Sequence, residues 1–160
     1  MLGFAVAEDF RKSDPEAFKI LATVSIPFRF HDDEYDIRCR KTVINLDERQ
    51  QVQEICFNTH LAGIFDLEPE AIEPFYLAYK AFKKLTQQES YQVILKLTGG
   101  EMVVFDNRRV LHGRNSFDPS TGYRHLQGCY VDRGEFESKL RKLSSSAEWN
   151  YLSALYSTEW

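Results

Sequence analysis

The sequence has few of the features that mark the commonest functional classes. None of its apolar runs approaches the roughly 18–20 residues needed to cross a bilayer, so we expect no membrane partner. A formal net charge of −4 over 160 residues argues against a nucleic-acid partner. There is no G-x-G-x-x-G, P-loop or G-x-S-x-G motif, so the usual nucleotide-binding and hydrolase interpretations have no support.

Cysteine is also scarce. Cys39, Cys56 and Cys129 are widely spaced and form no C-x-x-C pair. An odd number of dispersed thiols argues against a disulfide framework or a structural zinc site and fits a reducing compartment. Because the first residues also lack a basic, cleavable leader pattern, we expect a cytoplasmic protein.

The four histidines are too few for an all-histidine metal site with its supporting shell. A mononuclear iron site needs only two histidines and one carboxylate, and it leaves positions open for oxygen and a chelating cosubstrate. The histidine count therefore permits an iron site of this kind.

The hydrophobic patterning predicts a single domain that is mostly β with helices. The Asp14-Pro15-Glu16 sequence is a helix start, with Asp14 as the N-cap. Pro69 and Pro74 should be tolerable only in or before the first turn of a helix. We expect helices over 5–12, 15–21, 70–87 and 134–143, and strands over 25–30, 41–46, 51–57, 91–97, 102–105, 110–112 and 123–131. The strands cluster late without βαβ alternation, which favours an antiparallel jelly roll over a Rossmann sheet.

Two residues of the later strands suggest a chemistry. His112 lies in an apolar run before Gly113, and Arg124 follows a dozen residues later in the next predicted strand. A histidine can hold a metal while an arginine clamps the far carboxylate of a metal-chelating keto acid, because guanidinium makes a flat two-point contact. From the residues alone, His112 is as acceptable as a structural histidine, and an isolated Arg124 is more often a salt-bridge residue.

The runs FDNRRVLHGRNSF and GYRHLQGCY, with IPFRF, YDIRCRKTVINLD and FNTHLAGIFDLEPEAIEPFYLAYKAF upstream, resemble the gamma-butyrobetaine and trimethyllysine dioxygenase family. This family lies within the taurine-dioxygenase-like oxygenases. The resemblance covers roughly residues 1–143. It implies a double-stranded β-helix (jelly-roll) core, Fe(II) as the metal, 2-oxoglutarate as cosubstrate and ascorbate as a further cofactor.

The resemblance also implies roles for four residues. His112 matches the distal iron ligand, and Arg124 matches the arginine that pairs with the 2-oxoglutarate carboxylate. Tyr130 matches one wall of the aromatic cage around a trimethylammonium group, where a ring face stabilises a cation that it cannot hydrogen-bond. Asn58 matches the amide that binds the butyrobetaine carboxylate.

The family's other iron ligands, a His-x-Asp pair, lie upstream of the matched region. We therefore expect the fold to be incomplete at its N-terminus, with residues 1–143 as the C-terminal part of an oxygenase domain and 144–160 as a tail. His31-Asp32-Asp33 is formally His-x-Asp. The family comparison places it in a variable polar loop, and such charged runs are usually solvated turns.

The leading hypothesis is Fe(II)- and 2-oxoglutarate-dependent hydroxylation of a small trimethylammonium substrate, most simply gamma-butyrobetaine to L-carnitine in carnitine biosynthesis. One alternative is trimethyllysine as the substrate. Another is an inactive, truncated family member that acts as a binding or structural protein, with a homodimer as its expected assembly.

Overall fold

The computed structural model describes residues 1–58, 62–63, 66–114, 116, 118, 120 and 122–144. The chain divides into two units, Met1–Arg114 and Asn115–Trp160, and each is described by itself. The fold is a mixture of helices with small antiparallel sheets. No helix in the described residues has both the length and the hydropathy needed to cross a membrane.

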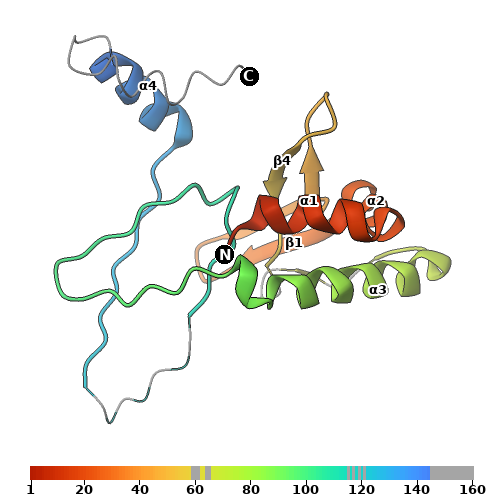
Figure 1. The fold of residues 1–160 in the computed structure, drawn as a ribbon, viewed down its shortest axis with the longest axis horizontal. Helices are drawn as coiled ribbons and strands as arrows, with labels where there is room; N and C mark the ends of the chain where they lie inside the picture. The colour runs from red at the N-terminus through yellow and green to blue at the C-terminus, as the bar shows by residue number, and fades with distance from the viewer. Residues whose placement is uncertain are drawn as a thin grey trace. The chain divides into compact units, whose positions relative to one another are not determined.

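Three helices form the body of the first unit (Figure 1). They are α1 (Gly3–Ser13), α2 (Pro15–Thr23) and α3 (Pro69–Thr86), followed by a short 3-10 turn, η1 (Glu89–Tyr91). Asp14 is the N-cap of α2, as predicted, because its carboxylate accepts a hydrogen bond from the Ala17 backbone N–H at 3.1 Å. Pro69 opens α3, but Pro74 lies beyond the first turn and the helix continues through it, so the expectation for Pro74 was wrong.

The core lies where these helices meet the small sheet formed by β3 (Ile44–Leu46) and β4 (Val52–Ile55). Phe10, Phe75 and Phe82 are the largest fully buried side chains among the described residues. The Phe10 and Phe82 rings meet edge to face with centroids 5.6 Å apart. Burial of these large aromatic side chains stabilises the core of the first unit.

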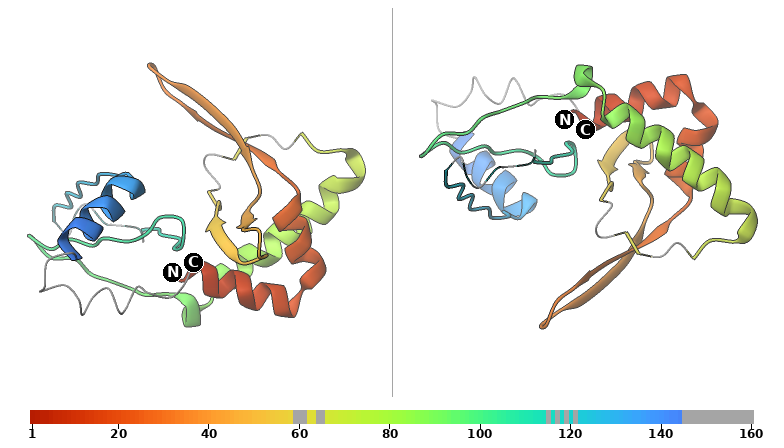
Figure 2. Two further views of the ribbon diagram at one scale, coloured as in Figure 1. Left: turned by 90° about the horizontal axis from the view of Figure 1, so that it is seen from above. Right: turned by 90° about the horizontal axis from the view of Figure 1, so that it is seen from below.

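A second antiparallel pair, β1 (Ile26–His31) and β2 (Asp36–Lys41), forms a hairpin that projects from the body of the first unit (Figure 2). The predicted strand 25–30 corresponds to β1, whereas β2 was not predicted. Every residue of β2 is exposed, so its polar sequence lacks the apolar alternation that marks a half-buried strand. Its pairing with β1 is what makes it a strand.

The later predicted strands are not formed. Residues 91–97, 102–105, 110–112 and 123–131 contain no strand. The described residues contain helices of 11, 9, 18 and 12 residues but strands of only 6, 6, 3 and 4 residues. The expected predominance of β structure is therefore not found. The two small sheets do not make up a jelly roll. A strand needs a neighbouring strand to pair with, and none of these segments is paired with a strand among the described residues.

Residues 92–105 instead form an extended segment that runs out from η1 and back towards the N-terminus (Figure 1); we call it the apolar arm. In the second unit, α4 (Arg133–Ser144) has no buried residue. Its Arg133 Nε pairs with Glu137 Oε1 at 2.6 Å, one turn further along. The predicted helix at 134–143 is thus confirmed.

Candidate functional site

His112 lies at the end of a tight turn that is fastened to the core. Asp106 builds the turn: its carboxylate accepts the Arg108 N–H at 2.9 Å, and its carbonyl accepts the Arg109 N–H at 3.1 Å. The Arg108 carbonyl then accepts the Ile55 N–H of β4 at 3.0 Å. These bonds fix the backbone that leads to His112, although they form a turn and not the predicted strand.

Two further contacts hold the chain beside His112. The Leu111 N–H donates to the Met1 carbonyl at 3.2 Å, and the Leu111 side chain packs against the core. The imidazole of His112 is exposed and lies against the Phe105 ring, with centroids 5.0 Å apart. The ring is therefore supported on one side by Phe105 and is otherwise open to solvent. Phe105 was not singled out from the sequence, and no spacing rule would have identified this contact.

Asn58 is exposed and lies in the same unit, three residues after the end of β4. Its neighbour Phe57 is held firmly: the Phe57 ring stacks at a tilt on Tyr79, with centroids 4.7 Å apart, and meets Phe82 edge to face at 5.3 Å. The backbone just before Asn58 is thus held against α3 by the Phe57 side chain.

Arg124 and Tyr130 belong to the second unit. Both are exposed, Tyr130 with 88% of its surface, and neither lies in a strand. The four residues suggested by the resemblance therefore divide between the units, Asn58 and His112 in the first and Arg124 and Tyr130 in the second.

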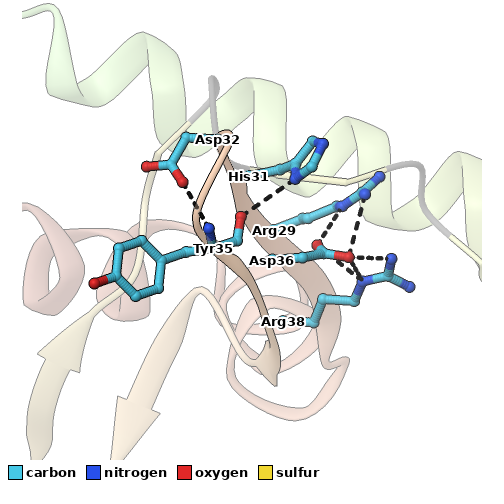
Figure 3. Close-up of polar contacts among 6 residues, drawn as sticks. All are labelled: Arg29, His31, Asp32, Tyr35, Asp36 and Arg38. Carbon is cyan, nitrogen blue, oxygen red and sulfur yellow. Dashed lines mark hydrogen bonds and ion pairs between the residues drawn. The ribbon is translucent and has the colours of Figure 1, made fainter.

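His31 and Asp32 are used to close the β1–β2 hairpin (Figure 3). The Asp32 carboxylate accepts the backbone N–H groups of Glu34 at 2.9 Å and Tyr35 at 2.7 Å. His31 Nδ1 lies 3.2 Å from the Tyr35 carbonyl oxygen, the geometry of a hydrogen bond in which the ring donates. Asp33 is exposed at the tip. This arrangement is the polar turn that was predicted, and His31 and Asp33 belong to no group of three or more possible metal-ligating side chains among the described residues.

A basic groove of about 700 Å³ lies along the same hairpin and was not predicted. Arg29, Arg38 and Arg40 line it together with Asp66. Asp36 accepts hydrogen bonds from Arg29 at 2.7 Å and from Arg38 at 2.5 Å (Figure 3). The Arg38 and then the Arg29 guanidinium hold the pKa of Asp36 well below its ordinary range. The alternation Arg38-x-Arg40 in the sequence is the one signal that this face would be basic.

The Arg40 guanidinium is also engaged. It binds the Asp66 carboxylate at 2.6 Å and the Ser25 carbonyl at 2.8 Å. Since each of the three arginines already has a carboxylate partner, the groove is best explained as a structural ion-pair network.

The three cysteines are free thiols, as expected. Cys39 and Cys129 are exposed, whereas Cys56 is half-buried beside Glu54. Burial, and then the Glu54 charge, raise the pKa of the Cys56 thiol to about 11. Cys56 is therefore protonated near neutral pH and is a poor metal ligand or nucleophile.

No group of three or more His, Cys, Asp or Glu side chains in the described residues is placed to hold a metal ion. A facial iron site needs three protein ligands. The described part of the chain therefore does not fit Fe(II) by itself, and His112 alone would bind it weakly.

Comparison with known proteins defines the class. Residues 3–130 match the family model for the taurine catabolism dioxygenase TauD, TfdA family. Because the match covers most of the chain, the protein belongs to this family. The resemblance inferred from FDNRRVLHGRNSF and the upstream runs is thus confirmed at the family level.

Within the family, the chain is similar to two groups of dioxygenases. It is 41% identical over 138 residues to gamma-butyrobetaine dioxygenase of Pseudomonas sp. (strain AK-1), covering 86% of this chain and 36% of the relative. It is 35% identical to the human gamma-butyrobetaine dioxygenase over 91% of this chain and 39% of the relative. A trimethyllysine dioxygenase of Meyerozyma guilliermondii is 28% identical over 88% of this chain and 36% of the relative. The chain spans less than two-fifths of the length of these curated relatives.

Proposed function

We propose that this chain is part of an Fe(II)- and 2-oxoglutarate-dependent dioxygenase that hydroxylates gamma-butyrobetaine to L-carnitine, a step of carnitine biosynthesis. The observation that carries the proposal is the 41% identity to the Pseudomonas gamma-butyrobetaine dioxygenase over 86% of the chain. Identity to the trimethyllysine dioxygenases is lower, for example 28%, so butyrobetaine is favoured as the substrate. The net reaction consumes oxygen and 2-oxoglutarate and releases succinate and carbon dioxide with the hydroxylated product.

The proposal gives each of the four residues a distinct task. His112 is one iron ligand, and the exposed side of its imidazole suits that task. The other two protein ligands of the iron come from residues outside the described set. Arg124 binds the far carboxylate of 2-oxoglutarate in a two-point contact. Asn58 donates its amide N–H to the substrate carboxylate, and the Tyr130 ring faces the trimethylammonium group.

The proposal extends to the fold and the cofactors. A jelly-roll core would bring strands together around the iron, with residues 1–143 as one part of that core and 144–160 as a tail. Ascorbate would keep the iron reduced.

The experiment is a chimera in which the matched segment of this chain replaces the corresponding 138 residues of the Pseudomonas relative. Purified chimera is supplied with Fe(II), 2-oxoglutarate and either gamma-butyrobetaine or trimethyllysine, and hydroxylated product and succinate are measured by mass spectrometry. We expect butyrobetaine hydroxylation, with trimethyllysine turned over at least tenfold less efficiently. A folded chimera that makes no product would contradict the proposal and favour the non-catalytic alternative.

Variants in the chimera test the individual roles. We expect H112A to abolish succinate formation, and R124A to raise the KM for 2-oxoglutarate by about tenfold or more, as loss of a charge-assisted pair predicts. N58A and Y130A should raise the KM for butyrobetaine and leave the KM for 2-oxoglutarate unchanged. His125, the neighbour of Arg124, supplies the matched control, and H125A should retain activity.

A further inference from the structure

The start of α1 lies against the backbone that leads to His112, although the two are far apart in the sequence; we call residues 106–111 the His112 turn. Gly3, the first residue of α1, is buried there. A methyl group added at Gly3 would lie 2.8 Å from the Arg109 carbonyl oxygen and 3.5 Å from the Arg109 carbonyl carbon. Both are backbone atoms, so they cannot swing aside as the end of a flexible side chain would. Glycine is therefore the residue that permits this approach.

Two further contacts join the same segments. The Leu111 N–H donates to the Met1 carbonyl at 3.2 Å. The Arg109 guanidinium lies over the Phe4 ring, 5.1 Å from its centroid, in the geometry of a cation–π contact. Residues on both sides of Gly3 thus contact the His112 turn, and the glycine lets the two backbones come close enough for both contacts to form.

The strand β4 holds the His112 turn as well. The Arg108 carbonyl accepts the N–H of the buried Ile55 at 3.0 Å. Ile55 Cγ1 also lies 3.6 Å from the place that a Gly3 methyl group would take. The His112 turn is therefore tied to β4 and to the start of α1 together, and a side chain at Gly3 would have to displace it. Such a displacement would be passed along the backbone to His112.

The position of the His112 imidazole depends on this backbone. The ring is exposed, and its contact with the Phe105 ring has centroids 5.0 Å apart. Because the core does not enclose the ring, the His112 turn largely determines where it lies. We propose that the first turn of α1 positions His112, with Gly3 as the positioning residue that permits the close approach to Arg109. The inference rests on the proposed function only in giving His112 a task in turnover, since the positioning itself needs neither metal nor substrate.

The test compares Gly3→Ala with Gly99→Ala in this chain, free of metal and at one pH. Gly99 lies in the apolar arm, where an added methyl group would meet nothing within 4 Å, so it gives the matched control. NMR records the cross-peaks of the His112 imidazole and the exchange of the Leu111 amide hydrogen. For Gly3→Ala we expect a displaced His112 signal and exchange at Leu111 about tenfold faster, because the bond to the Met1 carbonyl is weakened. Gly99→Ala should leave both unchanged.

A second variant alters the same contact without introducing a clash. Phe4→Leu removes the ring beneath the Arg109 guanidinium and keeps an apolar side chain. We expect the His112 signal to move, by less than in Gly3→Ala. Alanine is a better helix former than glycine, so α1 should persist in Gly3→Ala, and far-ultraviolet circular dichroism verifies this for each variant. If Gly3→Ala does not fold, Phe4→Leu decides.

A measurement in the chimera with the Pseudomonas relative separates positioning from a loss of folded protein. With Fe(II), 2-oxoglutarate and butyrobetaine supplied, we expect Gly3→Ala to raise the ratio of succinate to hydroxylated product about threefold or more, because a displaced His112 misaligns the reacting groups. A smaller amount of folded enzyme would lower both products together and leave the ratio unchanged. Gly99→Ala should keep the ratio of the parent chimera.

Three results would overturn the inference. They are an unchanged His112 signal and Leu111 exchange in folded Gly3→Ala or, if that variant does not fold, an unchanged His112 signal in Phe4→Leu; equal changes in Gly99→Ala; and an unchanged product ratio in an active Gly3→Ala chimera. The NMR measurements use neither iron nor substrate. An inactive parent chimera, together with a His112 signal that responds to Gly3→Ala, would therefore contradict the proposed function and leave the positioning of His112 intact.

Discussion

Phe82 is the side chain whose removal should most disturb the first unit. It is fully buried on α3, and its ring meets Phe10 and Phe57 edge to face, with centroids 5.6 Å and 5.3 Å away. Replacing a buried phenylalanine by alanine costs about 3–5 kcal/mol, and the loss of two aromatic contacts places Phe82→Ala towards the upper end. Since a domain of this size is stable by about 5–15 kcal/mol, this one change removes a large fraction of its stability.

Urea unfolding followed by circular dichroism measures this loss. Phe82→Leu, which keeps most of the volume, should cost about 1–2 kcal/mol and remain folded if the alanine variant does not. Leu77→Ala on the exposed face of the same helix should change the free energy of unfolding by less than about 0.5 kcal/mol. Equal effects of Phe82→Ala and Leu77→Ala would refute the assignment of the core to this face of α3.

Three further predictions follow from local contacts. Asp14→Ala should destabilise the first unit by about 1 kcal/mol in the same urea assay, and Asp14→Asn should restore most of that loss. The raised pKa of Cys56 means that folding favours its neutral thiol, so stability should fall as pH rises from 9.0 towards about 11; a pH series in which Cys56→Ala falls equally would contradict this. The lowered pKa of Asp36 means that its ion pairs persist at neutral pH and are lost only as pH falls well below 3.8; a carboxyl titration by NMR with a midpoint near 3.8 would exclude the pairs with Arg29 and Arg38.

The helices were predictable because their signals are local. Asp14 and Pro15 mark the start of α2 within a few residues, and the apolar spacing over 70–87 marks α3. The connection between the predicted strands 41–46 and 51–57 is also stabilised locally, since Asp47 Oδ1 accepts the Arg49 and Gln51 N–H groups. In these cases each stabilising hydrogen bond lies within a few residues of the signal that predicts it.

The strands were less predictable because their stability depends on distant partners. The polar β2 forms because β1 pairs with it from Ile26 opposite Lys41 to His31 opposite Asp36. The apolar runs 91–97 and 102–105 have the stronger strand sequences but no partner strand in the described residues, so they form no strand there. Apolar patterning states that a segment is suited to a strand, and only the rest of the fold decides whether it becomes one.

The candidate site shows the same difference between segments that local contacts stabilise and segments that need distant partners. The neighbours that position His112 and Asn58 are fixed by contacts in the first unit, through Leu111 and Phe57. Arg124 and Tyr130 lie in 123–131, a segment whose sequence predicts a strand and which forms none among the described residues. A carboxylate clamp and a cation-binding ring need a rigid backbone to hold their geometry. Partner strands outside the described residues should therefore matter more for the roles proposed for Arg124 and Tyr130 than for the role proposed for His112. Backbone NMR shifts of the chimera with the Pseudomonas relative, compared with those of this chain alone, should change more at 123–131 than at 108–112.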